Sequence, residues 1–468
     1  MPKALHVLTI LTVAAGISVP AATAQEAKPA WAACAGAPTQ ECANIEVPMD
    51  YQHPGGQRIS LAISRIRTAK PELRRGVLLL IPGGPGNSGL NRPSTLGTRL
   101  PQAVRDRYDL VGFDPRGVGR SSPVTCGLTA DDADPRAFLP WPGVDGDISA
   151  NVAKAERIAQ ACARNGGELI RHISTRTEAM DIDQIRRALG EPKLSYWGVS
   201  YGTYAGAVYA TMFPQRTDRV VLDSNDDPNP RKLERGWANN FAIGARDRFP
   251  DFAAWAAARN DTYGLGATPE AVTATYLNLA ASLDRQPRPD LTGNLVRAAM
   301  FNSLYSDATF PLLAQVLHAD PVPTIPVPPL DEFQNTLAVA NATVCNDVRW
   351  PRSVGFYARA VASNRQEFPL TAGMPANIFS CAFWPFDAEV AVPITAYGPD
   401  NVLLIQNRRD PATPYSGALK MLEAFGHRAR MVTVNAGGHG SYLVNGNPCG
   451  DNAVTDFLVN GTHRTASC

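Results

Sequence analysis

The sequence predicts an α/β fold organised around a mostly parallel sheet. Six short apolar or aromatic runs have the length of strands, at residues 76–81, 108–113, 193–197, 219–223, 401–406 and 429–434. The first of these is continuously apolar and ends at Pro-Gly, as expected of a strand that is buried on both faces. Helical stretches, such as the Ala-rich residues 203–210, separate several of the runs. Strands that alternate with helices in this way are typical of a parallel sheet covered by helices.

The N-terminal edge of this sheet is predicted to be antiparallel. Residues 44–49 and 57–67 alternate roughly between apolar and polar side chains, which indicates two paired strands with one solvated face. Residues 182–189, within a longer segment that begins near Glu178, have the spacing of an amphipathic helix, and Gly190 ends it.

The middle of the chain differs from the two ends in its residue pattern. Ala-rich helical stretches occupy residues 252–259 and 269–283, and a proline-rich connector occupies residues 320–330. Because no strand of the buried type is apparent there, we interpret the segment as a mainly helical insertion. The predicted division is a first core part at 25–224, a helical cap insertion at 225–395 and a C-terminal core part at 396–468.

Residues 1–24 are predicted to be a signal peptide. Lys3 is followed by an apolar stretch, and Ala22-Thr23-Ala24 fits a cleavage site after Ala24. The stretch is shorter than the roughly 20 apolar residues of a membrane span. We therefore expect an exported protein, secreted or periplasmic, without stable membrane insertion, although an uncleaved anchor is the alternative. The chain has 468 residues and a net charge of +1, which gives no support for a nucleic-acid partner.

The eight cysteines all follow the predicted cleavage site. An even number in an exported chain indicates disulfides, but the sequence alone does not determine their pairing. The simplest pairing joins neighbours along the chain, namely Cys34 with Cys42, Cys126 with Cys162, Cys345 with Cys381, and Cys449 with Cys468. Neither C-x2-C nor H-E-x-x-H occurs, so we predict no metal site and no cofactor.

Residues 197–202, Trp-Gly-Val-Ser-Tyr-Gly, contain the pattern G-x-S-x-G. Alone, this pattern is common and could be an ordinary glycine turn. Here a strand precedes it and a helix follows it, which is the setting of a nucleophilic serine on a sharp turn. Gly198 and Gly202 supply the small neighbours that let the two chain segments approach. The hypothesis is that Ser200 is a nucleophile.

A serine nucleophile needs a base and a group that orients the base. Asp410 follows the strand at 401–406, and His439 follows the strand at 429–434, so both are predicted at the sheet edge where Ser200 emerges. The order Ser, Asp, His is that of α/β-hydrolases. The rival acids are Asp223 and Asp114, and the rival histidines are His427 and His172.

Acyl transfer also needs donors for the oxyanion. We predict the backbone N–H of Tyr201 and that of Gly84, with Gly83 as the next choice, in the glycine-rich loop at 82–89. A phosphate-binding loop is the alternative, but the loop lacks both G-K-[ST] and G-x-G-x-x-G.

Five stretches together resemble the secreted bacterial tripeptidyl aminopeptidases, which are related to the proline iminopeptidases of the α/β-hydrolase fold. They are G-G-P-G-x-S-G at 83–89, F-D-P-R-G-V-G at 113–119, Y-W-G-V-S-Y-G-T-Y at 196–204, R-D-P-A-T-P at 409–414 and G-G-H-G at 437–440. The resemblance implies an α/β-hydrolase with a helical cap and a serine exopeptidase that releases short peptides, such as tripeptides, from free N-termini. Pro82 stands where proline-iminopeptidase relatives have histidine, so the resemblance does not extend to a preference for N-terminal proline.

The expected partners are peptides with free N-termini. Their ammonium group calls for a carboxylate, and the candidates are Asp347, Asp226 and Asp227, each of which could equally be a helix cap or a solvated surface group. A carboxylesterase or lipase with the same triad is the alternative function. Peptide-length preference and oligomeric state stay open.

Overall fold

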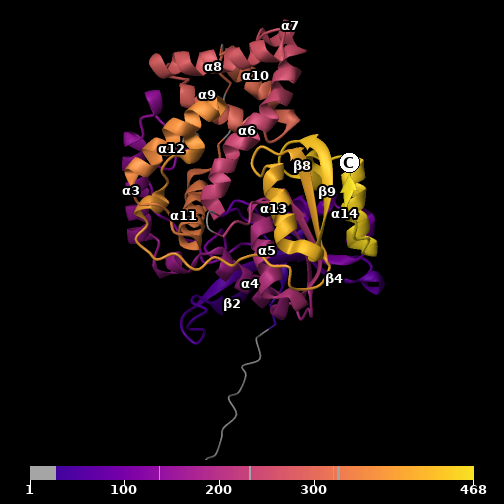
Figure 1. Cartoon of the computed structure of the whole chain (residues 1–468). Coiled ribbons are helices and arrows are strands. Elements are labelled where there is room, and N and C mark those ends of the chain that lie inside the picture. Colours follow the sequence, from indigo (N-terminus) through magenta and orange to yellow (C-terminus); the bar gives the residue numbers. More distant parts are fainter. Residues whose placement is uncertain (1–27, 136–137, 231–232, 320, 324–326) are drawn as a thin grey trace, which may run out of the picture.

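The fold is described from a computed structural model that covers residues 28–468 apart from 136–137, 231–232, 320 and 324–326 (Figure 1). The predicted signal peptide at 1–24 lies outside the described residues. Within the described part of the chain, no helix combines the length and the apolar character that crossing a membrane requires.

A ten-stranded sheet runs through the molecule in the order β1-β2-β3-β5-β4-β6-β7-β8-β9-β10. The pairs β1/β2, β2/β3 and β3/β5 are antiparallel, and all the other neighbours are parallel. The strands are β1 (Ala32–Cys34), β2 (Ala37–Pro48), β3 (Arg58–Ile66), β4 (Gly76–Ile81), β5 (Tyr108–Phe113), β6 (Leu194–Val199), β7 (Thr217–Asp223), β8 (Val402–Arg409), β9 (Ala429–Gly437) and β10 (Ala466–Ser467). The predicted fold class, an α/β-hydrolase with a mostly parallel sheet, is confirmed.

Helices cover both faces of the sheet. The α-helices are α1 (Arg92–Thr95), α2 (Gln102–Arg105), α3 (Ser149–Asn165), α4 (Thr175–Ala188), α5 (Tyr201–Met212), α6 (Leu233–Ala257), α7 (Asn260–Tyr263), α8 (Pro269–Arg285), α9 (Gly293–Ser303), α10 (Phe310–His318), α11 (Leu330–Asp347), α12 (Val354–Glu367), α13 (Tyr415–Phe425) and α14 (Pro448–Asn460). Helices α4, α5 and α13 pack on one face, and α2 and α14 pack on the other.

The alternation of side chains along β4 divides the core into two layers. Val77, Leu79 and Ile81 join the cluster under α4 and α5, whereas Leu78 and Leu80 join the cluster under α2 and α14. All six residues of this strand are buried. A strand covered on both faces must be apolar at every position, which is why the run at 76–81 is continuous rather than alternating.

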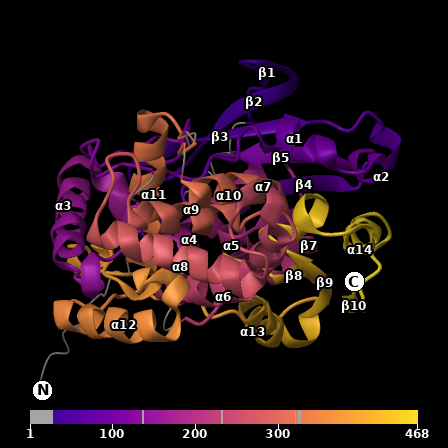
Figure 2. The ribbon, with the colours of Figure 1, turned by 90° about the horizontal axis from the view of Figure 1, so that it is seen from above.

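Helices α6 to α12 lie between β7 and β8 in the sequence, and the described residues of that segment contain no strand. Many of these helices share a core of their own, which includes Phe249, Phe252, Tyr276, Met300 and Phe310. Seen from above, α6 and α8 pass over the sheet and the helices that flank it (Figure 2). We refer to α6 to α12 as the cap helices.

Several sequence predictions are confirmed at residue level, and others miss. β4 and β5 have the predicted bounds, and β2 and β3 form the predicted antiparallel pair, although β1 lies outside them. The prediction of a helix at 252–259 captured only the end of α6, which begins at Leu233. α6 contains Pro250 and has little periodicity because it packs on several sides, so its amphipathic signal is weak.

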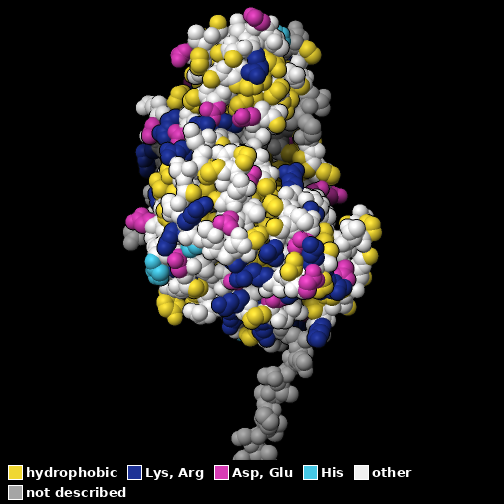
Figure 3. Space-filling model, turned by 90° about the vertical axis from the view of Figure 1, so that its right-hand side faces the viewer, with side chains coloured by type: hydrophobic (Ala, Val, Ile, Leu, Met, Phe, Trp, Pro, Cys, Tyr) yellow, Lys and Arg dark blue, Asp and Glu magenta, His cyan; other side chains and the backbone are white. Residues whose placement is uncertain are grey.

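Four disulfides join the cysteines in the simplest predicted pairing, and no described cysteine is free. Two of them, Cys126–Cys162 and Cys345–Cys381, each close a loop with a sequence separation of 36 residues. In the chain-entropy account, closing a loop of that size lowers the conformational entropy of the unfolded chain, which stabilises the folded state by about 4 kcal/mol. On the surface, basic and acidic side chains are interspersed on the face shown in Figure 3, in keeping with the net charge of +1.

Candidate active site

Ser200 occupies the sharp turn between β6 and α5. Its φ of 59° and ψ of −130° are unusual for a residue with a side chain, and such strain is typical of a nucleophile elbow. The flanking glycines are required here, because a Cβ at Gly198 would collide with the carbonyl oxygen of Gly202. A Cβ at Gly202 would lie 2.6 Å from the carbonyl oxygen of Pro82. The predicted strand–turn–helix is therefore present.

Asp410 and His439 form a close pair at the same edge of the sheet. Asp410 immediately follows β8, and His439 follows β9, the next strand in the sheet. Nδ1 of His439 lies 3.0 Å from each carboxylate oxygen of Asp410. The carboxylate is fully buried, and its Oδ1 also accepts the backbone N–H groups of Ala412 and Thr413, each at 2.9 Å. These bonds hold the carboxylate in one orientation, so it can orient the imidazole.

The His439 loop is also bound to the cap helices. The backbone N–H of His439 donates to the carbonyl oxygen of Tyr305 at 2.9 Å, and the two rings meet edge to face with centroids 5.1 Å apart. Tyr305 follows α9, so a residue from the middle of the chain supports the imidazole. No local pattern in the sequence marks Tyr305, so this contact could not be predicted.

The electrostatic environment of His439 favours its charged form. Burial is the largest influence and by itself lowers the pKa of His439, but the charges of Asp410, Asp226 and Asp223, with the Asp410 hydrogen bond, outweigh it. The net result is a pKa raised above the ordinary value of 6.5. The carboxylates of Asp410 and Asp223 thus favour an imidazolium at His439, and Asp226 adds to this effect when it is ionised.

We expect an acid limb in the activity profile that is displaced towards higher pH. A general base works in its neutral form, so a raised pKa means that activity is lost earlier as the pH falls, with a midpoint above 6.5. The measurement is kcat/KM against pH for a small chromogenic substrate, with protein stability followed over the same range. A flat profile down to about pH 4 would exclude a histidine base.

The glycine-rich loop after β4 lies against Ser200. A Cβ at Gly83 would meet the Cβ of Ser200 at 3.1 Å and its Oγ at 3.7 Å, and Gly84 is the next residue along the same loop. Asp114, a rival acid, holds this loop instead: its Oδ1 accepts the N–H groups of Gly89 and Leu90, both at 3.1 Å. Gly84, whose backbone N–H is one of the two predicted oxyanion donors, therefore lies in a tightly packed loop next to Ser200.

Helix α11 packs directly against the same loop. A Cβ at Gly86 would lie 2.5 Å from the carbonyl oxygen of Thr336, so the loop and the helix backbone are in direct contact. Asn335 binds the neighbouring segment through the carbonyl oxygens of Gly117 and Val124, at 2.8 and 2.7 Å. The N-terminal half of α11 is thus anchored to the core beside the loop.

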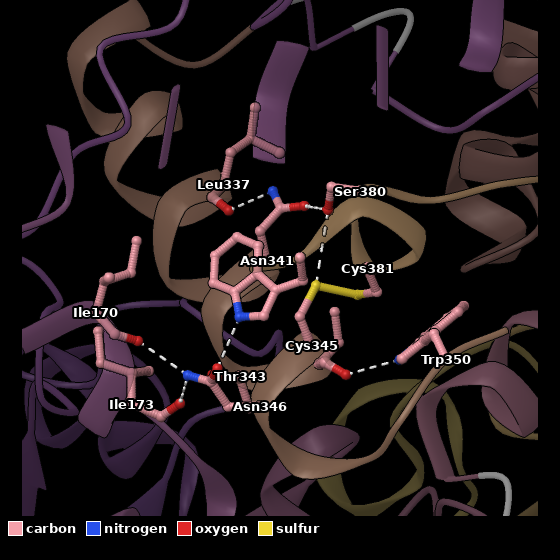
Figure 4. Close-up of a disulfide and its surroundings, with 12 residues drawn as sticks. Ile170, Ile173, Leu337, Asn341, Thr343, Cys345, Asn346, Trp350, Ser380 and Cys381 are labelled. Atoms are coloured by element: carbon pink, nitrogen blue, oxygen red, sulfur yellow. Dashed lines mark hydrogen bonds between the residues drawn. A yellow bond between two sulfur atoms is a disulfide. The ribbon is translucent and has the colours of Figure 1, made fainter. Parts of the chain in front are cut away.

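The far end of α11 is anchored as well (Figure 4). The side-chain amide of Asn346 donates to the carbonyl oxygens of Ile170 and Ile173 at 2.9 and 2.8 Å, and Cys345 forms its disulfide with Cys381. With contacts at both ends, α11 is fixed to the core beside the glycine-rich loop and is not a loosely attached lid.

The three candidate ammonium-binding carboxylates have different surroundings. Asp347, at the end of α11, accepts the backbone N–H of Thr175 at 2.8 Å, and Asp227 forms an ion pair with Lys420 at 2.5 Å. Asp226 is also buried, but among the described residues its carboxylate has no hydrogen bond or ion pair. Burial raises the pKa of Asp226 to about 8, with His439, Asp410 and Asp227 as the charges acting on it. Asp226 is therefore the one candidate whose buried carboxyl group has no hydrogen bond or ion pair among the described residues, and it interacts electrostatically with His439 and Asp410.

The remaining rivals lie elsewhere or have other contacts. His427 is in the short turn at the start of β9, the opposite end of that strand from His439. His172 lies before α4, near Glu168. Asp223 is buried at the end of β7, close to the site, and its carboxylate is bonded to the backbone of the His439 loop rather than to the imidazole.

Similarity to known proteins identifies the family to which the chain belongs. A family model described as "TAP-like protein" matches residues 369–468. The tripeptidyl aminopeptidase of Streptomyces coelicolor is 34% identical over 96% of this chain and 87% of its own length. The chain belongs to the tripeptidyl aminopeptidase family.

More distant members carry other names. Serine protease Hip1 of Mycobacterium tuberculosis is 29% identical over 90% of this chain and 85% of its own length. A protein named carboxylesterase B, also from Mycobacterium tuberculosis, is 29% identical over 91% of this chain and 85% of its own length. As a member of the tripeptidyl aminopeptidase family with the α/β-hydrolase fold, the chain is a serine hydrolase.

Proposed function

We propose that this protein is an exported serine aminopeptidase that releases short peptides, such as tripeptides, from free N-termini. The observation that carries the proposal is the buried Asp226 carboxyl group, which has no hydrogen bond or ion pair among the described residues and interacts electrostatically with His439 and Asp410, in a chain whose relative of 34% identity is a tripeptidyl aminopeptidase. A buried carboxylate of this kind fits the ammonium group of a peptide better than it fits a simple ester. The helical segment at 225–395 would act as a cap, and its helices would limit how much peptide enters.

The proposed chemistry is acyl transfer through Ser200. His439 takes the hydroxyl proton as Oγ attacks the scissile carbonyl carbon, and the carbonyl oxygen becomes an oxyanion that the N–H groups of Tyr201 and Gly84 would bind. His439 then gives the proton to the leaving amine as the C–N bond breaks. A water molecule, deprotonated by the same imidazole, hydrolyses the acyl-enzyme and frees Ser200.

Asp226 is proposed to receive the substrate's N-terminal ammonium group. With its pKa raised to about 8, the carboxyl is largely protonated in the free enzyme at neutral pH. An arriving ammonium favours the ionised form, so binding would release the carboxyl proton and form a charged pair inside the site. The distance from this pair to Ser200 would then set the number of residues removed per cleavage.

Asp226→Asn should raise KM for a peptidyl nitroanilide with a free amine by about 10- to 100-fold, because a buried charged hydrogen bond is replaced by a neutral one. The matched control is Asp227→Asn, since Asp227 is adjacent but already paired with Lys420. The same two variants are measured with a small acetate ester, which has no amine, and kcat/KM for that ester should be nearly unchanged. A higher KM in the Asp227 variant alone would assign the anchor to Asp227.

Carboxylesterase activity is the second candidate, and the relative named carboxylesterase B favours keeping it. The two functions differ in their need for a free amine. Acylating the N-terminus of the peptidyl nitroanilide should abolish hydrolysis by an aminopeptidase. An esterase would cleave both the free and the acylated nitroanilide poorly. It would prefer the acetate ester whether or not the peptide carries a free amine.

The proposed location is outside the cytoplasm, secreted or periplasmic, after cleavage behind Ala24. Four disulfides in one chain support an oxidising compartment. The predicted signal peptide supports the same location.

A further inference from the structure

The end of β7 presents a fully buried carboxylate to the His439 loop. Asp223 is the last residue of that strand, and its two oxygens accept the backbone N–H groups of Ser441 and Tyr442 at 2.7 and 3.0 Å. The indole N–H of Trp197, in β6, approaches the same carboxylate at 3.4 Å. Two consecutive backbone amides directed at one side chain make a specific attachment of the loop that carries His439.

The same strand end also holds the turn that carries Ser200. The carbonyl oxygen of Asp223 accepts the backbone N–H of Ser200 at 3.0 Å. The next residue, Ser224, accepts the backbone N–H of Gly440 through its hydroxyl at 2.9 Å. Two consecutive residues of one strand end therefore bind both Ser200 and the loop segment immediately after His439.

We propose that Asp223 is a positioning residue that sets the separation and orientation of His439 relative to Ser200. This inference rests on the proposed serine mechanism. The described residues contain no hydrogen bond between the Ser200 hydroxyl and the imidazole, so in this state the backbone attachments, rather than that bond, hold the two groups in register. Asp410 orients the ring from one side, and Asp223 anchors the chain that bears it.

A carboxylate suits this place better than any neutral side chain. Both of its oxygens accept, so both amides are satisfied, whereas an asparagine would direct its NH2 group at one of the two donors. The charge also matters to the base. The groups that face His439 are the carboxyl groups of Asp410, Asp226 and Asp223 and the ring of Tyr305, and each carboxyl group favours the imidazolium when it is ionised. Burial raises the pKa of Asp223 to about 6, so at neutral pH the side chain is ionised.

Asp223→Asn is the decisive variant, assayed with the free-amine nitroanilide. We expect kcat to fall by about 100-fold, as for a catalytic group displaced by a fraction of an ångström to an ångström, with KM changed by less than about threefold. The acid limb of the pH profile should move to lower pH, because one carboxylate that raises the imidazole pKa is lost. Labelling of Ser200 with a fluorophosphonate counts the folded sites, so that kcat refers to them alone.

Asp183→Asn is the matched control. Asp183 is a buried carboxylate on α4 that binds Arg186 and Arg216, away from the His439 loop. A residue that only stabilises the fold should reduce the number of labelled sites and leave kcat per site and the pH midpoint unchanged. The same pattern in Asp223→Asn would overturn the proposal.

Ser224→Ala keeps the proposal testable if Asp223→Asn does not fold. It removes one attachment of the loop, at Gly440, and should lower kcat by about tenfold with KM unchanged. An unchanged kcat in this variant would contradict positioning by the β7 end. If Ser200→Ala retained activity, the serine mechanism itself would fail; if Ser200→Ala is inactive and the β7 variants behave like wild type, only this inference fails.

Discussion

Ser200→Ala should lower kcat by about 10⁴- to 10⁶-fold while the protein remains folded. The variant removes the oxygen atom that would form the acyl-enzyme. Ser200 is the single residue between the end of β6 and the start of α5, so no neighbouring residue of that turn can replace it. Alanine has no larger side chain than serine, so it should fit the strained turn without new contacts. The measurement is initial rate at saturating nitroanilide, with circular dichroism as the test of folding.

Ser195→Ala serves as its control. Ser195 is a buried serine of the same strand that donates to Asp218 at 3.2 Å, near the opposite end of β6. It should retain nearly full activity and differ from wild type only slightly in stability. If Ser200→Ala kept a tenth of the wild-type rate, Ser200 would lose the role of nucleophile.

The convergence of three distant residues at one sheet edge could be predicted because it follows from topology. Ser200, Asp410 and His439 come directly after, or within two residues of, β6, β8 and β9, and the carboxyl ends of parallel strands share an edge. Strand character in these segments is visible in the sequence, since each contains a short run rich in apolar or aromatic residues. Because each of the three residues follows such a strand, their placement at one sheet edge can be predicted without knowledge of any side-chain contact.

Contacts that depend on the cap helices could not be predicted in the same way. Tyr305 reaches His439 from more than a hundred residues away in sequence, and Asn335 and Asn346 reach the core from α11. Each is an ordinary residue in its local context, and only the packing of α9 and α11 on the core gives it a role. Asp223 likewise was predicted only as a rival acid, because its residue type and position suit that role and its bonds to the His439 loop leave no trace in the sequence.

The three carboxylates offered for the substrate amine illustrate the limit of composition. Asp226, Asp227 and Asp347 are equivalent in sequence, yet one is ion-paired, one is bonded to a helix N-terminus and one is buried without a partner among the described residues. The partner of each carboxylate depends on residues that are distant in sequence, such as Lys420 in α13, which pairs with Asp227.

Asp410→Asn should lower kcat by about 10⁴-fold, and the geometry gives the reason. Oδ1 of Asp410 accepts the N–H groups of Ala412 and Thr413, so the oxygen of an asparagine would remain there and its NH2 group would replace Oδ2. That NH2 group would face Nδ1 of His439 as a donor. The imidazole would then place its own proton on Nε2, the nitrogen that must accept the proton of Ser200.

The tautomer argument separates this effect from a general loss of stability. Asp400→Asn is the matched control, because Asp400 approaches the imidazole of His463 at 3.1 Å and precedes β8, at the opposite end of that strand from Asp410. It should retain nearly wild-type kcat. In Asp410→Asn, kcat should recover partly at high pH, where hydroxide can replace the base, whereas KM should change little because Asp410 does not contact the substrate. A variant with wild-type kcat and only a lower melting temperature would show that Asp410 is structural and that the acid must be sought elsewhere, with Asp223 the first to test.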